Sequence, residues 1–452
     1  MTNQIASPGR IASIDIFRAL TMTLMIFVND LWTLSGIPQW LLHTPADYDG
    51  MGLSDVVFPA FLFIVGLSIP HAIDNRRKKA EKDLKILGHI LLRSLALITM
   101  GFFLVNFENI SRGSLPILPE IYEILLIVAF FLIWTKYPSE KIKAIPVSFL
   151  QGAGVVLLVA LAAIYKGAGE ELPWMKIHWW GILGLIGWAY LFSALVCFLS
   201  KGRLPWIIAA LAAVMLLNLQ EVLAGGSGFK LIVSASNHFL VMAGVLASTI
   251  FRKTHSHAGT PDPLALHKGN ERLMAAFPGG KGKTEGSQET DGPGNPGGSG
   301  NGVAVSALSA EGSGTAAKKY RSYFLVLMAL GAAALIYGFL VRPLGGISKI
   351  HATPSWTMIC AGISLMVLAL LYFLTDRLKI TSWARIIAPA GRSTLTCYLI
   401  PYVVYPLLSL LHFKLPAALT TGPMGLLKSL LFALLIVVLT RLMEKLRITL
   451  KI

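Results

Sequence analysis

The sequence predicts an all-α fold, a polytopic membrane bundle of about 11–12 transmembrane helices with both termini in the cytoplasm. Of the 452 residues, 55% are hydrophobic and only 14% are charged, whereas soluble proteins carry about 25% charged residues. Apolar stretches of about 20 residues recur from end to end, and each can cross a hydrocarbon core of about 30 Å. Helices are expected because an open strand cannot satisfy its backbone hydrogen bonds in lipid.

Twelve apolar stretches, bounded by Pro, Gly or charged residues, predict the individual helices. They cover residues 14–34, 54–73, 86–107, 116–135, 145–165, 179–199, 204–223, 237–251, 322–341, 355–375, 386–410 and 425–441. The first stretch is long and turns polar at its end, which favours a transmembrane helix over a cleaved signal peptide. An even number of crossings places both termini on the same side.

The net charge of +16 is explained by topology. Most of the 39 Lys and Arg residues, including the RRKK run at 76–79, fall in segments that the twelve crossings place on the side of the termini. Positively charged loops stay in the cytoplasm, so this side is predicted to be cytoplasmic. The excess charge therefore indicates orientation, and no nucleic-acid partner is expected.

Three regions follow from the composition. Residues 1–252 hold the first eight helices and a candidate active-site loop at 37–54, and residues 318–452 hold the last four helices. Residues 253–317 are rich in Gly, Pro and Ser and are expected to form a flexible cytoplasmic linker, because they cannot bury enough apolar surface to fold. The GGKGKT segment within them lacks the spacing of a phosphate-binding loop.

Ionisable and polar residues within membrane helices are functional hypotheses by default. In the first helix, Asp15 and Arg18 are three residues apart and can pair, either as a structural ion pair or at a cytoplasmic entrance. Asn29 and Asp30 lie at the other end of this helix. Asn29 is interpreted either as a hydrogen-bonding group for a substrate or as a helix-packing contact.

The loop that follows contains His43, Tyr48 and Asp49, and Asp55 begins the next helix. The pKa of a free histidine suits proton transfer near neutral pH, and neighbouring carboxylates can fix its tautomer. His43 is therefore a candidate general base, with an exposed surface histidine as the alternative. Asp55 is a candidate partner or a simple helix cap.

Other polar positions are less specific. His238 begins the eighth helix as a cap or a ligand, and Arg392 with Ser393 lies inside the eleventh. Pro119 and Pro401 suggest broken helices, which are tolerated at membrane depth where they line a protein cavity. The sequence has no HxxxH or HExxH motif, so no metal site is expected.

The opening segments RIASIDIFRALTMTLMIFVND and YDGMGLSDVVFPAFLFIVGLSI resemble the signature of the heparan-α-glucosaminide N-acetyltransferase family and its bacterial relatives. That signature is approximately R-x-x-S-x-D-x-F-R-G, then V-N, a His, and W-x-G-L-x-x-A-D-L-V-F-P. Ala19 replaces its Gly here, and Tyr48 replaces its Trp. Weaker similarity continues in HWWGILGLIGWAYL, SNHFLVMAGV, SKIHATPSW and PAGRSTLTCYL.

The resemblance implies a membrane acyltransferase that moves an acetyl group from cytosolic acetyl-CoA to an amino sugar or glycan on the far side. The family's active His, helix-end Asn and Asp transfer onto His43, Asn29 and Asp55, which are expected to be catalytic. The remaining expected site residues follow in two sets. For the acceptor they are Asp30, Tyr48, Asp49 and His238, and for acetyl-CoA they are Asp15, Arg18, Arg392 and Ser393.

Two other functions remain open from the sequence. A secondary transporter for sugars or cell-wall fragments would use Glu120, Glu123 or Glu221, and a catalytically inactive scaffold would use none of these residues. A bacterial member would lie in the inner membrane among lipids and would take a cell-wall or recycled amino sugar. A homodimer is compatible with such a bundle, and the sequence leaves the oligomeric state open.

Overall fold

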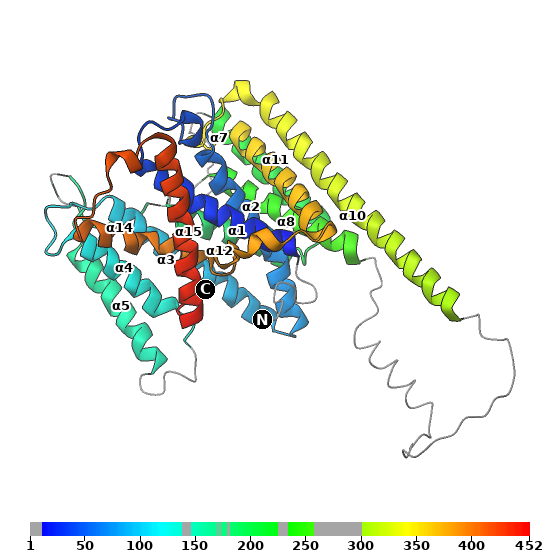
Figure 1. Cartoon of the computed structure of the whole chain (residues 1–452), viewed down its shortest axis with the longest axis horizontal. Helices are drawn as coiled ribbons and strands as arrows, with labels where there is room; N and C mark the ends of the chain where they lie inside the picture. The colour runs from blue at the N-terminus through cyan, green and yellow to red at the C-terminus, as the bar shows by residue number, and fades with distance from the viewer. Residues whose placement is uncertain are drawn as a thin grey trace, which may run out of the picture. The chain divides into compact units, whose positions relative to one another are not determined.

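The computed structural model describes residues 11–137, 146–169, 171, 173–178, 181–224, 234–256 and 301–452. The longer helices follow one another along the chain (Figure 1). They are α1 (Ala12–Asp30), α2 (Ser54–Lys78), α3 (Asp83–Glu108), α4 (Pro119–Trp134), α5 (Val147–Ile164), α6 (Ile182–Leu199), α7 (Leu204–Leu223), α8 (Ala235–Ser256), α10 (Asn301–Leu340), α11 (Pro354–Leu371), α14 (Pro401–Leu410) and α15 (Gly422–Leu446). Shorter pieces are η1 (Leu31–Thr33), η2 (Gln39–Leu41), η3 (Arg342–Leu344), η4 (Tyr372–Arg377), η5 (Ser382–Arg385), α12 (Ala388–Arg392), α13 (Thr394–Leu399) and η6 (Ala417–Leu419).

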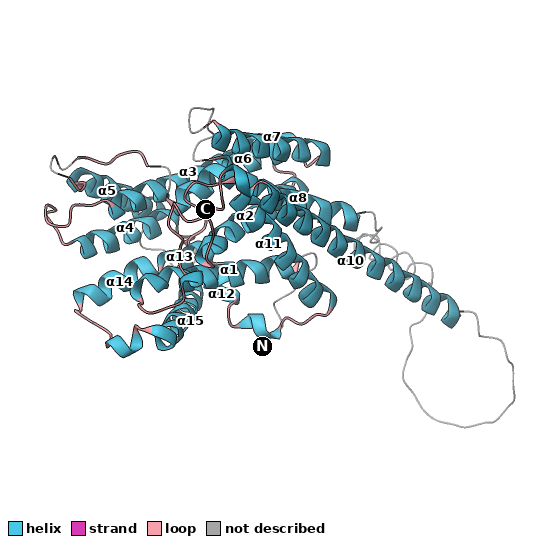
Figure 2. Cartoon of the chain, turned by 90° about the horizontal axis from the view of Figure 1, so that it is seen from above, coloured by secondary structure: helices cyan, strands magenta, loops and turns pink. Residues whose placement is uncertain are grey.

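The predicted all-α membrane bundle is confirmed. Within the described ranges, nine helices are long and apolar enough to cross a membrane, and Figure 2 shows helices joined by loops. One predicted helix differs, because residues 386–410 are divided among α12, α13 and α14, with breaks before Thr394 and at Pro401. Pro119 does not break a helix. It stands at the first position of α4, where a missing N–H leaves no hydrogen bond unmade.

The chain divides into two compact units, residues 1–249 with 324–452, and residues 250–323. The second unit contains the first part of α10, which begins at Asn301. Helix therefore covers residues 301–317 of the stretch that the composition suggests as a flexible linker. The rest of that expectation falls mainly on residues 257–300, which lie outside the described residues.

α1 is the central helix of the first unit. It contacts α2, α11, α12, α13 and α15, and Figures 1 and 2 both show it among these elements. Glycines allow other helices to pack closely, as is common in membranes. A Cβ atom at Gly66 would lie 1.9 Å from the Val241 carbonyl oxygen of α8, and one at Gly244 would lie 2.0 Å from the Phe63 oxygen of α2.

The two ends of this bundle carry different elements, in the alternation that the twelve-helix topology predicts. At one end, Arg77 of α2 donates to the Phe198 carbonyl of α6, and Asp376 accepts hydrogen bonds from the backbone N–H groups of Ala12 and Ser13. The opposite end gathers the end of α1 and the starts of α2, α11 and α15. The positive-inside rule predicts that the end with the RRKK run is cytoplasmic.

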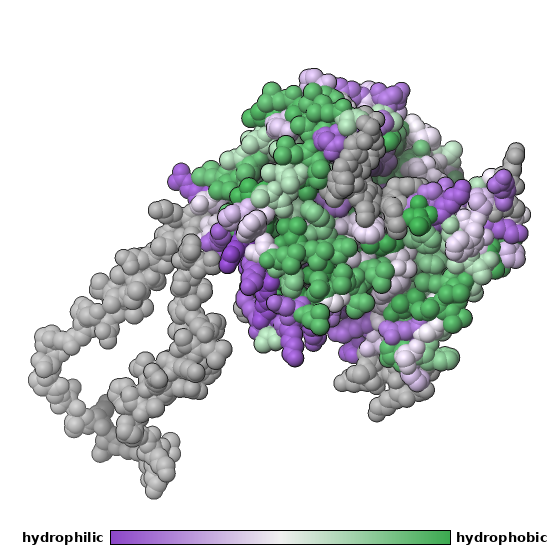
Figure 3. Space-filling model, turned by 180° about the vertical axis from the view of Figure 1, so that it is seen from behind, coloured by the Kyte–Doolittle hydropathy of each residue, from purple (hydrophilic) through white to green (hydrophobic). Residues whose placement is uncertain are grey.

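The outer face of the bundle is apolar, as expected of helices that contact lipid. Figure 3 shows apolar side chains over the middle of one face, with hydrophilic residues gathered toward its margins. Large exposed apolar residues occur on several helices. They include Leu91, Leu92 and Leu95 of α3, Val155, Val156 and Val159 of α5, Leu216 of α7, and Leu431 and Val438 of α15.

Candidate active site

A cavity of about 580 Å³ opens at the end of the bundle that is predicted to be non-cytoplasmic. The end of α1, the start of α2, the loop between them, α3, α4, α13 and α14 contribute its walls. The lining residues include Asn29, Trp32, His43, Ser54, Glu108, Glu123, Ile182, Tyr398, Tyr402 and Tyr405. We call this space the outer cavity. It contains two of the three residues expected to be catalytic, His43 and Asn29.

Asp55, the third, is buried behind His43 at the start of α2, where its side chain is only 1% exposed. Its Oδ2 atom accepts hydrogen bonds from the Thr44 backbone N–H at 3.1 Å, the Thr44 hydroxyl at 3.0 Å and the Gly52 N–H at 3.1 Å. A Cβ atom at position 52 would lie 1.9 Å from the Leu42 carbonyl oxygen, so only glycine permits this loop path. The loop therefore folds around a fixed carboxylate.

His43 connects this buried carboxylate to the cavity. Its Nδ1 atom lies 2.7 Å from Asp55 Oδ1, and its side chain is 52% exposed. Because Oδ2 already accepts three hydrogen bonds, Oδ1 is the acceptor for the Nδ1 proton. This assigns the neutral ring a lone pair on Nε2, the arrangement by which an Asp orients a catalytic His base. The pair can therefore accept a proton from a group in the outer cavity.

Lys349 also reaches this pair, from the loop between α10 and α11. Its Nζ atom lies 3.1 Å from His43 Nδ1 and 3.8 Å from Asp55 Oδ1. Burial lowers the pKa of the Lys349 ammonium, and the Asp55 carboxylate partly opposes this effect. The sequence did not identify this residue, because about 300 residues separate it from His43 and only its position in the resembling SKIHATPSW segment marked it.

Asn29 and Asp30 are neighbours in sequence but face different surroundings. Asn29 lines the outer cavity, and its amide has no hydrogen-bond partner among the described residues. Asp30 is instead buried against α14 and α15 and lies outside the lining of the outer cavity, so its role in an acceptor site stays a prediction. Its carboxylate accepts hydrogen bonds from Tyr405 at 2.7 Å, Lys428 at 2.6 Å and Ser429 at 2.5 Å.

The other expected acceptor residues also lie outside the lining of the outer cavity. Tyr48 is 59% exposed on the loop surface. Asp49 accepts hydrogen bonds from Arg342 Nε at 2.9 Å and from the Ile347 N–H at 2.7 Å. His238 donates from Nδ1 to the Ser234 carbonyl at 2.9 Å. The contacts of Asp49 join two loops, and that of His238 lies at the start of α8; the expected role of all three residues in acceptor binding stays a prediction.

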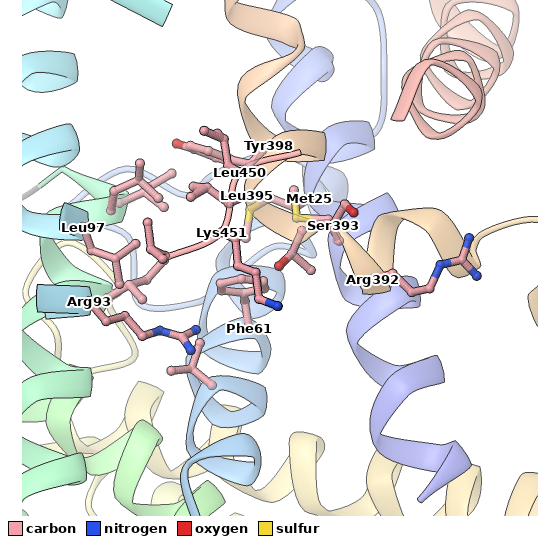
Figure 4. Close-up of a pocket in the computed structure, with 17 residues that line it drawn as sticks. Met25, Phe61, Arg93, Leu97, Arg392, Ser393, Leu395, Tyr398, Leu450 and Lys451 are labelled. Carbon is pink, nitrogen blue, oxygen red and sulfur yellow. The ribbon is translucent and has the colours of Figure 1, made fainter. Parts of the chain in front are cut away.

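A second cavity, of about 170 Å³, lies toward the predicted cytoplasmic end. We call it the inner cavity. Arg392 and Ser393 line it, as do two cations that the sequence did not assign to a site, Arg93 and Lys451. In Figure 4 the charged ends of Arg93 and Lys451 lie on one side of the cavity, and the Arg392 guanidinium points away from it. Arg392 instead binds Glu444 at 2.7 Å.

Arg93 is the most unusual of these cations. Its guanidinium stacks on the Tyr190 ring at 4.9 Å, and its buried Nε atom has no hydrogen-bond partner among the described residues. An intramembrane Arg is a signal for function that sequence reasoning could have used. Asp15 and Arg18 pair at 3.1 Å and lie outside the lining of the inner cavity, so their role in acetyl-CoA binding stays a prediction.

Two residues, Ile182 and Tyr398, line both cavities and therefore stand between them. The Tyr398 hydroxyl is 3.1 Å from that of Tyr402, which lines the outer cavity. Polar groups thus continue from the inner cavity toward His43 and Asn29. Neither tyrosine was identified from the sequence, although Tyr398 lies in the resembling PAGRSTLTCYL segment.

Two of the three glutamates that a transporter would use, Glu120 and Glu221, form hydrogen bonds within the protein. Glu221 accepts hydrogen bonds from the Ala235 N–H and the Ser234 hydroxyl, and Glu120 accepts one from Ser409. Glu123 and Glu108 line the outer cavity. In the part of the chain that the structure describes, no group of three or more His, Cys, Asp or Glu side chains could hold a metal ion.

Comparison with known proteins gives a family and two partial relatives. Residues 10–236 match the model of a family described as a domain of unknown function (DUF5009). The heparan-alpha-glucosaminide N-acetyltransferases of Mus musculus and Homo sapiens are each 36% identical to the chain over 110 residues. This stretch is 24% of the chain but only 16% of either relative, so the similarity covers a small part of those proteins.

Proposed function

The chain belongs to the family described as a domain of unknown function (DUF5009), and from this premise and the site we propose that it is a transmembrane acetyltransferase. It would take the acetyl group of cytosolic acetyl-CoA and deliver it to an amino sugar or glycan on the non-cytoplasmic side. The partial similarity to two curated N-acetyltransferases supports the reaction class.

One observation carries the proposal. The oriented His43–Asp55 pair opens into the outer cavity, which meets a cationic inner cavity at Ile182 and Tyr398. A base at one end and cations at the other suit a donor whose reactive end and charged end are far apart. Acetyl-CoA is such a donor, because its phosphates are separated from its thioester by a long uncharged arm.

The inner cavity suits the charged end of the donor. Arg93 and Lys451 present cations on the predicted cytoplasmic side, where phosphate groups would be recognised by charge and hydrogen bonding. Arg93 is better suited than Arg392, because Glu444 already neutralises Arg392. The uncharged arm would then pass between Ile182 and Tyr398 toward the outer cavity.

The outer cavity suits a sugar that carries an amine. Its volume of about 580 Å³ falls within the usual range of small-molecule sites. Trp32 and Tyr405 supply aromatic surfaces, while Glu108 and Glu123 supply carboxylates for hydroxyl or ammonium groups. The acidic lining favours an amine-bearing acceptor.

The proposed chemistry uses His43 as the base. Nε2 takes a proton from the acceptor amine, a bond forms between the amine nitrogen and the thioester carbonyl carbon, and the C–S bond breaks to release CoA thiolate. The Asn29 amide, which has no other partner in the part of the chain that the structure describes, would donate to the carbonyl oxygen as negative charge develops there. Alternatively, Nε2 attacks the thioester carbonyl carbon and the C–S bond breaks to release CoA thiolate; the acceptor amine then attacks the acetyl-His43 carbonyl, the bond to Nε2 breaks, and the amine gives its proton to the freed imidazole.

The test is acetyl transfer across a reconstituted membrane. Proteoliposomes with radiolabelled acetyl-CoA on one side and glucosamine on the other should form N-acetylglucosamine. His43→Ala should lower the rate by about a thousandfold because it removes the base, whereas His238→Ala, a buried histidine outside the cavity, should retain most activity in protein that stays folded.

Undiminished transfer by His43→Ala would contradict the assignment. Sugar flux without loss of the acetyl group from acetyl-CoA would instead support the transporter.

A further inference from the structure

The loop between α10 and α11 brings a cation to the catalytic pair. Lys349 Nζ lies 3.1 Å from His43 Nδ1 and 3.8 Å from Asp55 Oδ1, and its side chain is 28% exposed. A lysine at a protein surface ordinarily extends into solvent. This one is turned inward against a histidine, and the proposed steps leave it without a role.

The position of Lys349 is fixed by contacts on both sides of it. Asp49 binds Arg342 and the Ile347 N–H, and the Ile347 carbonyl accepts a hydrogen bond from the Gly50 N–H at 3.0 Å. After Lys349, Asn218 Nδ2 donates to the Ala352 carbonyl at 3.0 Å. The loop that carries Lys349 is thus joined to the loop that carries His43.

Charge balance shows what the ammonium does. With a neutral His43, one positive charge on Lys349 faces one negative charge on Asp55. A protonated His43 would add a second positive charge about 3 Å from the first, and like charges at this distance oppose each other strongly in a partly buried site. Asp55 acts in the opposite sense, because a carboxylate favours a protonated histidine.

We propose that Lys349 is a positioning residue whose ammonium disfavours a second positive charge on His43 and so leaves the Nε2 lone pair available to accept a proton. This inference rests on the proposed function and deepens it by naming what sets the protonation of the base. Among the described residues that line the outer cavity, the other acidic groups are Glu108 of α3 and Glu123 of α4. Arg112 is close enough to interact electrostatically with Glu123, whereas Lys349 is the cation beside His43 and Asp55.

The experiment measures protonation of His43 without requiring acetyl transfer. Diethylpyrocarbonate reacts with unprotonated imidazole, and peptide mass spectrometry of the full chain in detergent gives the fraction of His43 modified between pH 5 and 9. Lys349→Met should move the midpoint of this curve to higher pH, because the repelling charge is gone. Lys349→Arg keeps the charge and should leave the midpoint near that of the unchanged protein.

Activity gives a second measurement. The acidic limb of the pH profile of kcat/KM for acetyl transfer should move with the modification curve in Lys349→Met and stay in place in Lys349→Arg. Thermal stability in detergent identifies any variant that does not fold, and Lys349→Gln is a second neutral variant for that case.

Two outcomes would overturn the inference. One is an unmoved midpoint in folded Lys349→Met and Lys349→Gln, and the other is an equal displacement in Lys349→Arg. Absence of acetyl transfer by the unchanged protein would instead contradict the proposed function, and the modification curve would still report on Lys349.

Discussion

Asp30 and Asp55 are both 1% exposed, lie at the same end of consecutive helices, and accept several hydrogen bonds. They differ in the role of the side chains that bind them. Tyr405, Lys428 and Ser429 use Asp30 to hold three helices together. One oxygen of Asp55 instead binds His43, whose ring continues into the outer cavity.

Burial of a charged group in a membrane protein therefore does not by itself locate the catalytic site. A buried carboxylate serves a reaction when one of its partners has a free reactive atom that faces a cavity. It serves the fold when all its partners end within the protein. The same distinction separates Arg93, which faces the inner cavity, from Arg392, which is neutralised by Glu444.

The largest expected effect comes from Asp55→Asn. The amide cannot accept the Nδ1 proton as a carboxylate does and favours the wrong tautomer of His43, so kcat for acetyl transfer should fall by about a thousandfold. Steady-state kinetics in proteoliposomes measures this. A rate within threefold of the unchanged protein would show that the pair does not act as proposed.

The next largest effect is expected at the inner cavity, where substitutions of its two arginines should change the KM for acetyl-CoA by different amounts. Arg93→Met should raise the KM for acetyl-CoA by about tenfold, because it removes a cation with no carboxylate partner among the described residues, worth about 1.4 kcal/mol in binding. Arg392→Met should change this KM by much less. Equal effects of the two substitutions would contradict the distinction between free and engaged cations.

Asp30→Asn tests the structural side of the comparison. Removing one partner of a buried ion pair leaves Lys428 without its counter-charge, which should lower the free energy of unfolding by about 3 kcal/mol. The melting temperature in detergent should therefore fall, while kcat of the protein that remains folded stays within a few-fold of its original value. Loss of kcat at unchanged stability would place Asp30 in the catalytic site after all.

The smallest effect is expected at Asp49, whose carboxylate joins two loops at the surface. The hydrogen bond from the Ile347 N–H and the Arg342 guanidinium lower the pKa of Asp49. The Asp49 carboxylate therefore stabilises the joined loops at neutral pH. This stabilisation is lost as the pH falls below about 4, the ordinary pKa of an aspartate, and through the lowered pKa of Asp49.

Asp49→Asn should raise hydrogen exchange of the amides of residues 346–352 at pH 7 and lower acetyl transfer by a few-fold, since Lys349 becomes less well placed. Unchanged exchange in this segment would show that Asp49 does not anchor the loop.

The sequence was sufficient for the parts of the site that are close along the chain. His43 and Asp55 are twelve residues apart, and a short loop around a helix start brings them together. The sequence also marked Asn29 and Asp30 as site residues, and the structure places Asn29, but not Asp30, in the lining of the outer cavity. Successive residues on an α-helix point about 100° apart, and here Asn29 faces the outer cavity while Asp30 faces α14 and α15.

The remaining parts depend on tertiary packing. Lys349 reaches His43 only because the Asp49 contacts join two distant loops. Tyr398 lies between the cavities because the predicted helix 386–410 breaks at Ser393 and Pro401. The apolar pattern indicates that this region lies in the membrane, but it does not specify how the broken pieces turn.

The separation of Arg93 from His43 by Ile182 and Tyr398 has an electrical consequence for the proposed reaction. The phosphates of the donor would remain at the cytoplasmic end, and only an uncharged two-carbon group would pass to the other side. Moving one elementary charge against a potential of 100 mV requires about 2.3 kcal/mol. The transfer is electroneutral when the proton that His43 takes from the amine passes on to the CoA thiolate, so that the neutral thiol returns to the cytoplasmic end. The membrane voltage would then neither drive nor oppose acetylation.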